Sequence, residues 1–212
     1  MNMKGDFRRT AVGARWLAVV VAGLALSACS LPEAVPDLTR FYVLTPTLAA
    51  VEESAPGDAA VPSLAIRSVV VPEFLRGKVM QVRLAQNEVR FVDLARWAEP
   101  LEAGLQRVLR ENFARRTGAV RVVARGGEAH DYEVAIHVRH CEGVMPAGVA
   151  RLAARVEIHS AGLEAKLVAE EEFTTDVPGW DGKDYGELAG KLSEAAGALS
   201  ERILALLAER RG

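Results

Sequence analysis

The stretch DYEVAIHVRHC, residues 131–141, decides the fold class that we expect for this chain. Apolar and polar side chains alternate in it from Tyr132 to Arg139, which predicts a half-buried strand because successive side chains of a strand point to opposite faces. The segments ARLAARVEIHS (150–160) and GLEAKLVAEEEFTT (162–175) repeat the alternation. Three such strands in succession predict an antiparallel meander with one face covered and the other in water.

Further strands are expected on the N-terminal side of the meander. RFYVL (40–44) and AVRVVA (119–124) are short runs of β-formers, and LAIRSVVVP (64–72) is apolar enough to predict burial on both faces. VMQVRL (79–84) and EVRFVDL (88–94) are separated by a short polar link and predict a hairpin.

Two helices are expected to cover the sheet. The first starts at Pro100, carries apolar residues at helical spacing and ends before Gly118. The second is long, and Asp184 followed by Glu187 predicts a capping box at its start. The sequence therefore predicts one domain, residues 40–212, of the α/β (α+β) class: a two-layer sandwich in which a mixed, largely antiparallel sheet is covered by two helices.

The N-terminal apolar run from Trp16 to Ala28 has 13 residues, too few to cross a bilayer, which takes about 20. It follows Lys4, Arg8, Arg9 and Arg15, the arrangement of a secretory signal peptide. We therefore expect residues 1–28 to be a cleaved leader.

The end of this run, Leu26-Ser27-Ala28-Cys29, resembles the lipobox of bacterial lipoproteins. The resemblance implies cleavage before Cys29 and acylation of Cys29, for example with palmitate, and two or more acyl chains make a stable anchor. Ser30 rather than Asp at the next position implies, by the same resemblance, the periplasmic face of the outer membrane. Residues 29–39 contain two prolines and no apolar period, so we expect a lipidated tether.

Charge and cysteine content exclude some classes of partner and bond. Removal of the leader leaves 22 Lys and Arg against 27 Asp and Glu, a net charge of −5, which does not favour nucleic-acid binding. Cys141 is the second of two cysteines, so an acylated Cys29 leaves no intrachain disulfide. Cys141 is expected to be a small, buried or half-buried side chain.

RFYVL (40–44), VVVPEFLRGKVM (69–80) and NEVRFVDLARWAEPLEAGLQRVLRENF (87–113) together resemble the PqiC-like auxiliary lipoproteins of ABC-type and MCE-domain transport systems. The most specific piece is RWAEPL, residues 96–101. The resemblance implies a periplasmic subunit that works beside an MCE-domain protein and inner-membrane transport components, in moving lipids between membranes and maintaining the envelope.

Basic residues near the expected hairpin are the candidate contacts for an acidic partner or for lipid phosphates. With the adjacent tryptophan, the candidate set is Arg76, Lys78, Arg83, Arg90, Arg96 and Trp97. For Trp97 two roles are open: packing at the corner between strand and helix, or anchoring an interface.

Catalysis, a cofactor and a metal are not supported by the sequence. In a regular strand His137 and Cys141 share one face and His140 points to the other, so the three cannot meet at one metal without a bulge. The main hypothesis is a non-enzymatic interaction subunit, and the alternative is a lipid carrier with an apolar pocket between sheet and helices. Small residues of the last helix indicate either close packing on the sheet or a homo-oligomer: Ala189, Gly190, Ala195, Ala196 and Gly197.

Overall fold

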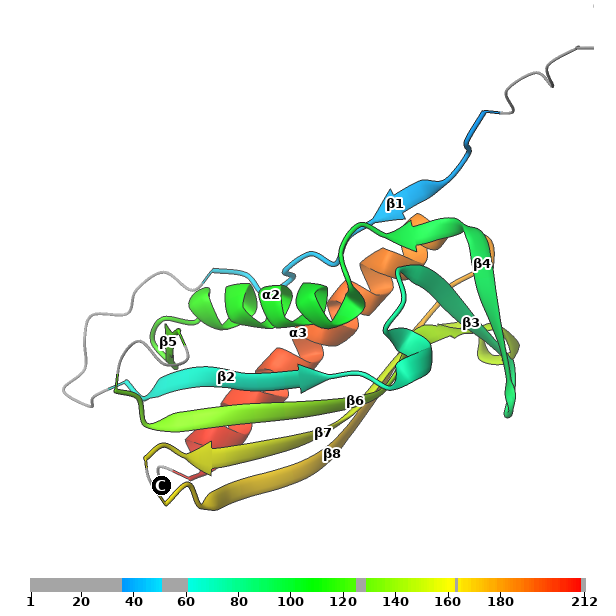
Figure 1. The fold of residues 1–212 in the computed structure, drawn as a ribbon. Helices are drawn as coiled ribbons and strands as arrows, with labels where there is room; N and C mark the ends of the chain where they lie inside the picture. The colour runs from blue at the N-terminus through cyan, green and yellow to red at the C-terminus, as the bar shows by residue number, and fades with distance from the viewer. Residues whose placement is uncertain (1–35, 51–60, 125–128, 163, 211–212) are drawn as a thin grey trace, which may run out of the picture. The chain divides into compact units, whose positions relative to one another are not determined.

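The structure of this protein is a computed structural model that describes residues 36–50, 61–124, 129–162 and 164–210. Every helix and strand of the described residues belongs to one compact unit, Thr39–Gly212, in which Figure 1 shows a sheet with two helices lying along it. The expected leader and the lipidation site Cys29 lie outside the described residues.

The strand β6 (Tyr132–Val144) lies at the centre of the sheet. The strand β7 (Val149–Ser160) runs antiparallel to β6 along its length, and β8 (Leu167–Pro178) pairs with β7 in the same way. On its other edge β6 pairs in parallel with β2 (Ser63–Val70) over its first half and with β3 (Val79–Ala85) at its end. The short strand β5 (Arg121–Val123) pairs with β2. The predicted meander and mixed sheet are confirmed.

Two helices cover one face of this sheet. The helix α2 (Leu101–Ala114) packs against β2 and β5, and α3 (Tyr185–Glu209) packs against β7 and β8. The strand residues on the covered face are the apolar half of each alternation, and they are buried: Val134, Ile136 and Val138 of β6 and Leu152, Val156 and Ile158 of β7. The predicted two-layer sandwich is the observed fold.

The predicted hairpin is formed by β3 and β4 (Glu88–Trp97), which pair antiparallel. The register between them shifts close to Val79, and on its other edge the end of β4 pairs in parallel with β1 (Arg40–Tyr42). In this pairing Phe41 lies beside Arg96. Figure 1 shows β1 alongside the end of β4, which makes β1 an edge strand of the sheet.

Burial follows the predicted pattern in α2 and departs from it in β2. The large apolar residues of α2 are at most 1% exposed, and each contributes roughly 1.5–3 kcal/mol by leaving water. In β2, Leu64 and Ile66 are buried, but Val70 is 38% exposed. The expectation that β2 is buried on both faces is therefore wrong at its C-terminal end, because the helices cover only one face of the sheet.

The start of α3 uses half of the predicted capping box. The Asp184 carboxylate accepts hydrogen bonds from the backbone N–H groups of Gly186 and Glu187. The N–H of Asp184 donates to the Asp181 carboxylate, so the Glu187 side chain is not needed there and forms an ion pair with Lys191 instead. The N-cap is thus confirmed, and the reciprocal bond is replaced by a turn closed by Asp181.

A buried asparagine holds the segment that follows β1 against both helices. Asn112 of α2 is fully buried, and its Oδ1 accepts hydrogen bonds from the N–H groups of Thr47 (3.1 Å) and Leu48 (3.2 Å). Its Nδ2 donates to Ser200 Oγ of α3 at 3.1 Å. One side chain thereby satisfies two backbone donors that secondary structure leaves unpaired.

Replacement of Asn112 by Ala is expected to lower the free energy of unfolding by about 3 kcal/mol, since the buried N–H of Leu48 and the part-buried N–H of Thr47 would lose their acceptor. Urea denaturation followed by tryptophan fluorescence measures this loss. The control is Glu102→Ala on the exposed side of the same helix, which should change little. Equal stability of the two variants would contradict the role of Asn112.

Candidate functional site

The face of the meander away from the helices is polar and lies in water. Alternation along β6, β7 and β8 brings arginines and carboxylates of these three strands to the same face. They form cross-strand ion pairs: Arg139 with Glu172, Arg155 with Glu170 and Arg151 with Asp176. We call this surface the open face.

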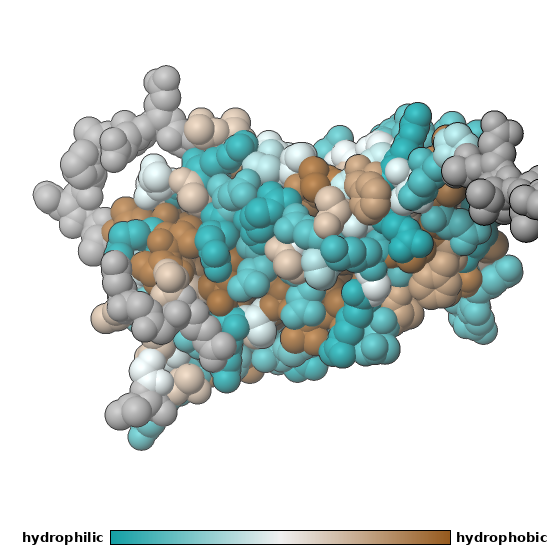
Figure 2. All heavy atoms as spheres, turned by 45° about the horizontal axis from the view of Figure 1, so that its top comes forward, coloured by the Kyte–Doolittle hydropathy of each residue, from teal (hydrophilic) through white to brown (hydrophobic). Residues whose placement is uncertain are grey.

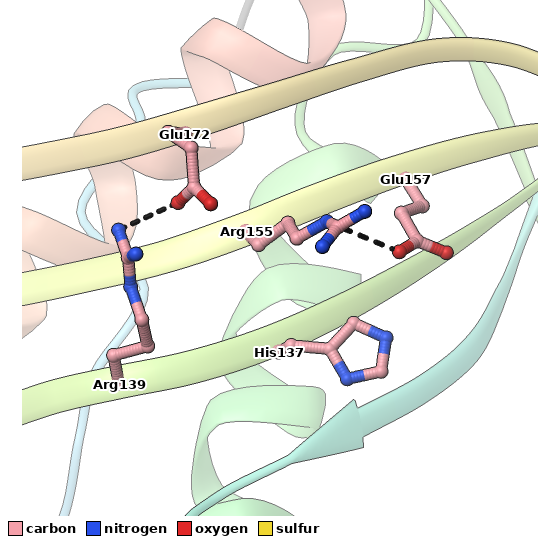
Figure 3. A pocket seen from close by; sticks show the side chains of 5 residues that line it. All are labelled: His137, Arg139, Arg155, Glu157 and Glu172. Atoms are coloured by element: carbon pink, nitrogen blue, oxygen red, sulfur yellow. Dashed lines mark ion pairs between the residues drawn. The ribbon is translucent and has the colours of Figure 1, made fainter.

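A shallow pocket of about 380 Å³ lies in the open face. It is lined by His137, Arg139, Arg155, Glu157 and Glu172, which come from β6, β7 and β8 (Figure 3). Arg139 and Glu172 are paired across the strands, while the Arg155 guanidinium lies 3.3 Å from Glu157. The lining offers charged and hydrogen-bonding groups of both signs, a surface suited to polar contacts and not to an acyl chain.

The pair of Arg151 and Asp176 on the open face is bidentate. Arg151 Nε and Nη2 each donate to one oxygen of Asp176 at 2.7 Å, and these bonds hold the pKa of Asp176 below its usual value. Both side chains are about one-third exposed, so the pair adds little to stability. Such charges are available for contacts with a partner of complementary charge.

A second charged cluster is buried where β3 meets β6. The Glu142 side chain is fully buried; its Oε1 accepts a bond from Arg83 Nε at 2.6 Å and lies 2.9 Å from His140 Nδ1. Arg83 also donates to the backbone carbonyl of Gln86 in the hairpin turn. Glu142 Oε2 has no hydrogen-bond partner in the described structure. The cluster joins the hairpin to the central strand.

The predicted basic residues differ in their exposure and in their contacts. Arg76 pairs with Glu73, and Lys78 donates to the carbonyl of Ala98. Arg90 and Arg96 are exposed, and neither forms an ion pair with a described residue.

Two members of the candidate set are not available to a partner. Trp97 is 3% exposed and belongs to the hydrophobic core, so packing between strand and helix is its role and an interface role is excluded in this fold. Arg83 is largely enclosed by its contact with Glu142. The local sequence cannot reveal this contact, because Glu142 is 59 residues away.

A bulge changes the geometry expected for HVRHC. The register between β6 and β7 shifts between Val138 and His140, so Arg139 is an extra residue. His137 and His140 consequently lie on the open face and Cys141 on the helix face, which corrects the expectation that His137 and Cys141 share a face. Within the residues that the structure describes, no three His, Cys, Asp or Glu side chains gather closely enough to hold a metal ion.

Cys141 is 2% exposed, as expected for a small core residue. Burial, aided by the negative charge of Glu142, raises the pKa of its thiol to about 12. At pH 8 we therefore expect maleimide to modify native Cys141 at least about a thousandfold more slowly than an ordinary cysteine, because the thiolate is the reacting form. Mass spectrometry after timed labelling checks this, with urea-unfolded protein as the control. Rapid labelling of the native protein would contradict the burial of Cys141.

Sequence reasoning missed the contact between Gly143 and Trp180. Trp180 is buried, and a Cβ placed on Gly143 would overlap its ring. The indole N–H donates to the carbonyl of Asp184 at 2.8 Å. The segment GWDGKD (179–184) thus packs Trp180 against β6 just before α3 begins. The available signal was a glycine inside a strand, which often marks close approach of another group.

The alternative function, a lipid carrier, would need an apolar pocket between the sheet and the helices. Of the small α3 residues, Ala189, Ala195, Ala196 and Gly197 are buried inside the chain, whereas Gly190 is exposed. Close packing within the fold accounts for the buried members. Among the described helices, none combines the length and the apolar character needed to cross a bilayer.

Residues 42–204 match the protein family described as the ABC-type transport auxiliary lipoprotein component. The match runs from the end of β1 into α3 and so spans the described sheet. No curated protein matches the sequence significantly.

Solved structures resemble the fold. The crystal structure of protein XCC0632 from Xanthomonas campestris, a member of family DUF330, has a TM-score of 0.66 and 20% identity, covering 81% of this chain and 98% of that chain. The crystal structure of an uncharacterized protein has a TM-score of 0.64 and 18% identity, covering 80% and 98%. At these identities the likeness supports the fold alone.

Proposed function

Since this chain belongs to the family of ABC-type transport auxiliary lipoprotein components, we propose that it is a non-catalytic subunit of an ABC- and MCE-type system that moves lipids between the membranes of the cell envelope. The acylated Cys29 holds it on the periplasmic face of the outer membrane. Its partners are an MCE-domain periplasmic protein and inner-membrane transport components. The family match agrees with the resemblance to the PqiC-like auxiliary lipoproteins.

The observation that carries this proposal is the extent of the family match, residues 42–204, over a fold that begins at Arg40. The leader and the lipobox support the location. Cys29 stands eleven residues before the first strand, so an anchor there would hold the folded domain close to the membrane. In this function the domain binds a partner and a membrane, and the transported lipid is handled by the other subunits.

We place the contact with the MCE-domain protein on the open face, and assign Arg90 of the hairpin and Arg76 and Lys78, which precede it, as additional positive charge. The helices cover the opposite side of the sheet, whereas the open face is solvated and hollowed (Figure 3). Polar interfaces with complementary charge give specificity and fast association more than high affinity, which suits a subunit of a dynamic transport system.

Site-specific photo-crosslinking in envelope membranes tests this function. A photoreactive amino acid replaces Thr174 on the open face or Arg90 on the hairpin, and the matched control replaces Arg110 on the exposed side of α2. We expect an MCE-domain protein to be recovered from the first two positions and not from the third. Recovery of lipid alone at all positions would favour the carrier function and overturn the proposal.

A further inference from the structure

The outer face of β1 and of the end of β4 carries apolar side chains that the fold leaves in water. Phe41 is 63% exposed, Val43 46% and Leu94 52%. Arg96 lies between Phe41 of β1 and the half-buried Val79 of β3 in the strand pairing. Since side chains alternate along a strand, Phe41, Val43, Leu94 and Arg96 share one face, which we call the β1 patch.

On the opposite face of β1 and of the end of β4 the side chains are packed against the core, so only one face of these strands is exposed. Ala95 and Trp97 of β4 are buried, and Tyr42 of β1 packs against the core. Figure 2, in which the top of Figure 1 comes forward, shows brown apolar groups lying open among polar ones. The strands therefore use one face for the core, and no described helix or strand covers the other.

Positive charge borders the β1 patch. Arg96, on the same face as Phe41 and Leu94, is exposed and forms no ion pair with a described residue. Apolar groups next to unpaired guanidinium groups are suited to a lipid surface, because the rings and alkyl chains enter the boundary of the acyl layer while the cations meet phosphates.

The chain itself brings the β1 patch to a membrane. Arg40 is the first residue of β1 and stands eleven residues after Cys29, a distance of at most about 40 Å when fully extended. Once Cys29 is anchored, the β1 patch is the first folded surface along the chain. Its local concentration at the bilayer is then high, and weak contacts are enough for binding.

We propose that the β1 patch docks on the headgroup layer of the membrane that holds Cys29, and that this second contact stops the domain from swinging freely on its tether. The proposal rests on the lipid anchoring put forward above. It assigns the exposed Phe41, Val43 and Leu94 to contact with lipid and Arg96 to contact with lipid phosphates. The open face of the meander is not part of this contact.

Depth-dependent fluorescence quenching tests the β1 patch in the mature, lipidated protein. Leu94→Cys carries a bimane label on the patch, and Leu167→Cys, which starts from the same 52% exposure on β8, is the matched control. The native thiol of Cys141 is buried and does not compete for the label. Each labelled protein is reconstituted into vesicles of phosphatidylethanolamine and phosphatidylglycerol that contain a spin-labelled lipid as quencher.

We expect several-fold stronger quenching at position 94 than at position 167, and a loss of this difference when Phe41 and Val43 are both replaced by Ser. Flotation of each protein with the vesicles reports anchoring separately. A protein that floats but shows equal quenching at both positions overturns the docking and leaves the anchoring intact. A protein that does not float overturns both.

Two further outcomes concern other occupants of the patch. A spectral shift of the label at position 94 that needs no vesicles and grows with protein concentration would assign the patch to a second copy of the chain. Protection of this label only in envelope extracts, and not on pure lipid, would assign it to another protein. Either result overturns docking on lipid.

Discussion

Replacement of Cys29 by Ala is expected to abolish fatty-acid attachment and to remove the protein from the outer membrane. The thiol is the nucleophile that receives the lipid in the lipoproteins that this leader resembles, and Ala has no group to replace it. With no acyl chain, the apolar run from Trp16 to Ala28 is too short to serve as an ordinary membrane span. Labelling with radioactive palmitate and fractionation of the two membranes measure both effects.

The matched control, Ser30→Asp, keeps the lipid anchor and is expected to change the membrane in which the protein is retained. In Ser30→Asp the lipobox and Cys29 are intact, so palmitate incorporation should persist, while the resemblance to Gram-negative lipoproteins predicts retention in the inner membrane. The anchoring hypothesis would be contradicted if the Cys29→Ala protein still incorporated palmitate and still lay in the outer membrane. An unchanged distribution of Ser30→Asp would contradict only the role of Ser30.

The second large effect is expected at the contact between Trp180 and Gly143. Trp180→Ala removes a buried ring and its hydrogen bond to Asp184, which should lower the free energy of unfolding by about 3–5 kcal/mol. Gly143→Ala should cost about 1–3 kcal/mol by overpacking, because Gly143 pairs with Val82 and Ala150 on both sides and its backbone cannot move away from the ring. Denaturant unfolding gives both values.

A double-mutant cycle separates this contact from general damage. In the Trp180→Ala background the Cβ of Gly143→Ala has room, so the second substitution should cost little or nothing. The matched control is Gly118→Ala, where nothing lies within 4 Å of an added Cβ. Additive losses in the cycle, or an equal loss for Gly118→Ala, would show that the ring does not limit position 143.

Several elements could be predicted because their signals are local. Alternation placed β6, β7 and β8 within a few residues of their bounds, and helical spacing identified the buried face of α2. The N-cap at Asp184 was equally readable, since a capping side chain bonds to the next turn of its own helix. The Glu187 half of the box failed because Asp181 competes for the same N–H group.

The candidate site was predicted less well, because its geometry depends on residues far apart in the chain. Charge clustering identified Arg90 and Arg96 as exposed, but it also included Arg83, which a buried carboxylate encloses. The open face could be expected as a solvated surface, but not its pocket. The bulge at Arg139 places His140 on the face of His137 and Cys141 on the opposite face, and no local pattern in HVRHC signals the extra residue.

Local pattern alone was enough for the class of the fold and the order of its strands and helices, because periodicity and capping act between near neighbours. Packing alone decided which side chains remain at the surface: Trp97 in the core, Trp180 on Gly143, and Phe41 with Leu94 in water. The physical reason is that burial depends on which elements meet, and Phe41 and Trp97 receive opposite environments from strands of the same sheet. The local sequence does not distinguish an aromatic residue that will be exposed from one that will be buried. The difference arises only when the helices cover one face of the sheet.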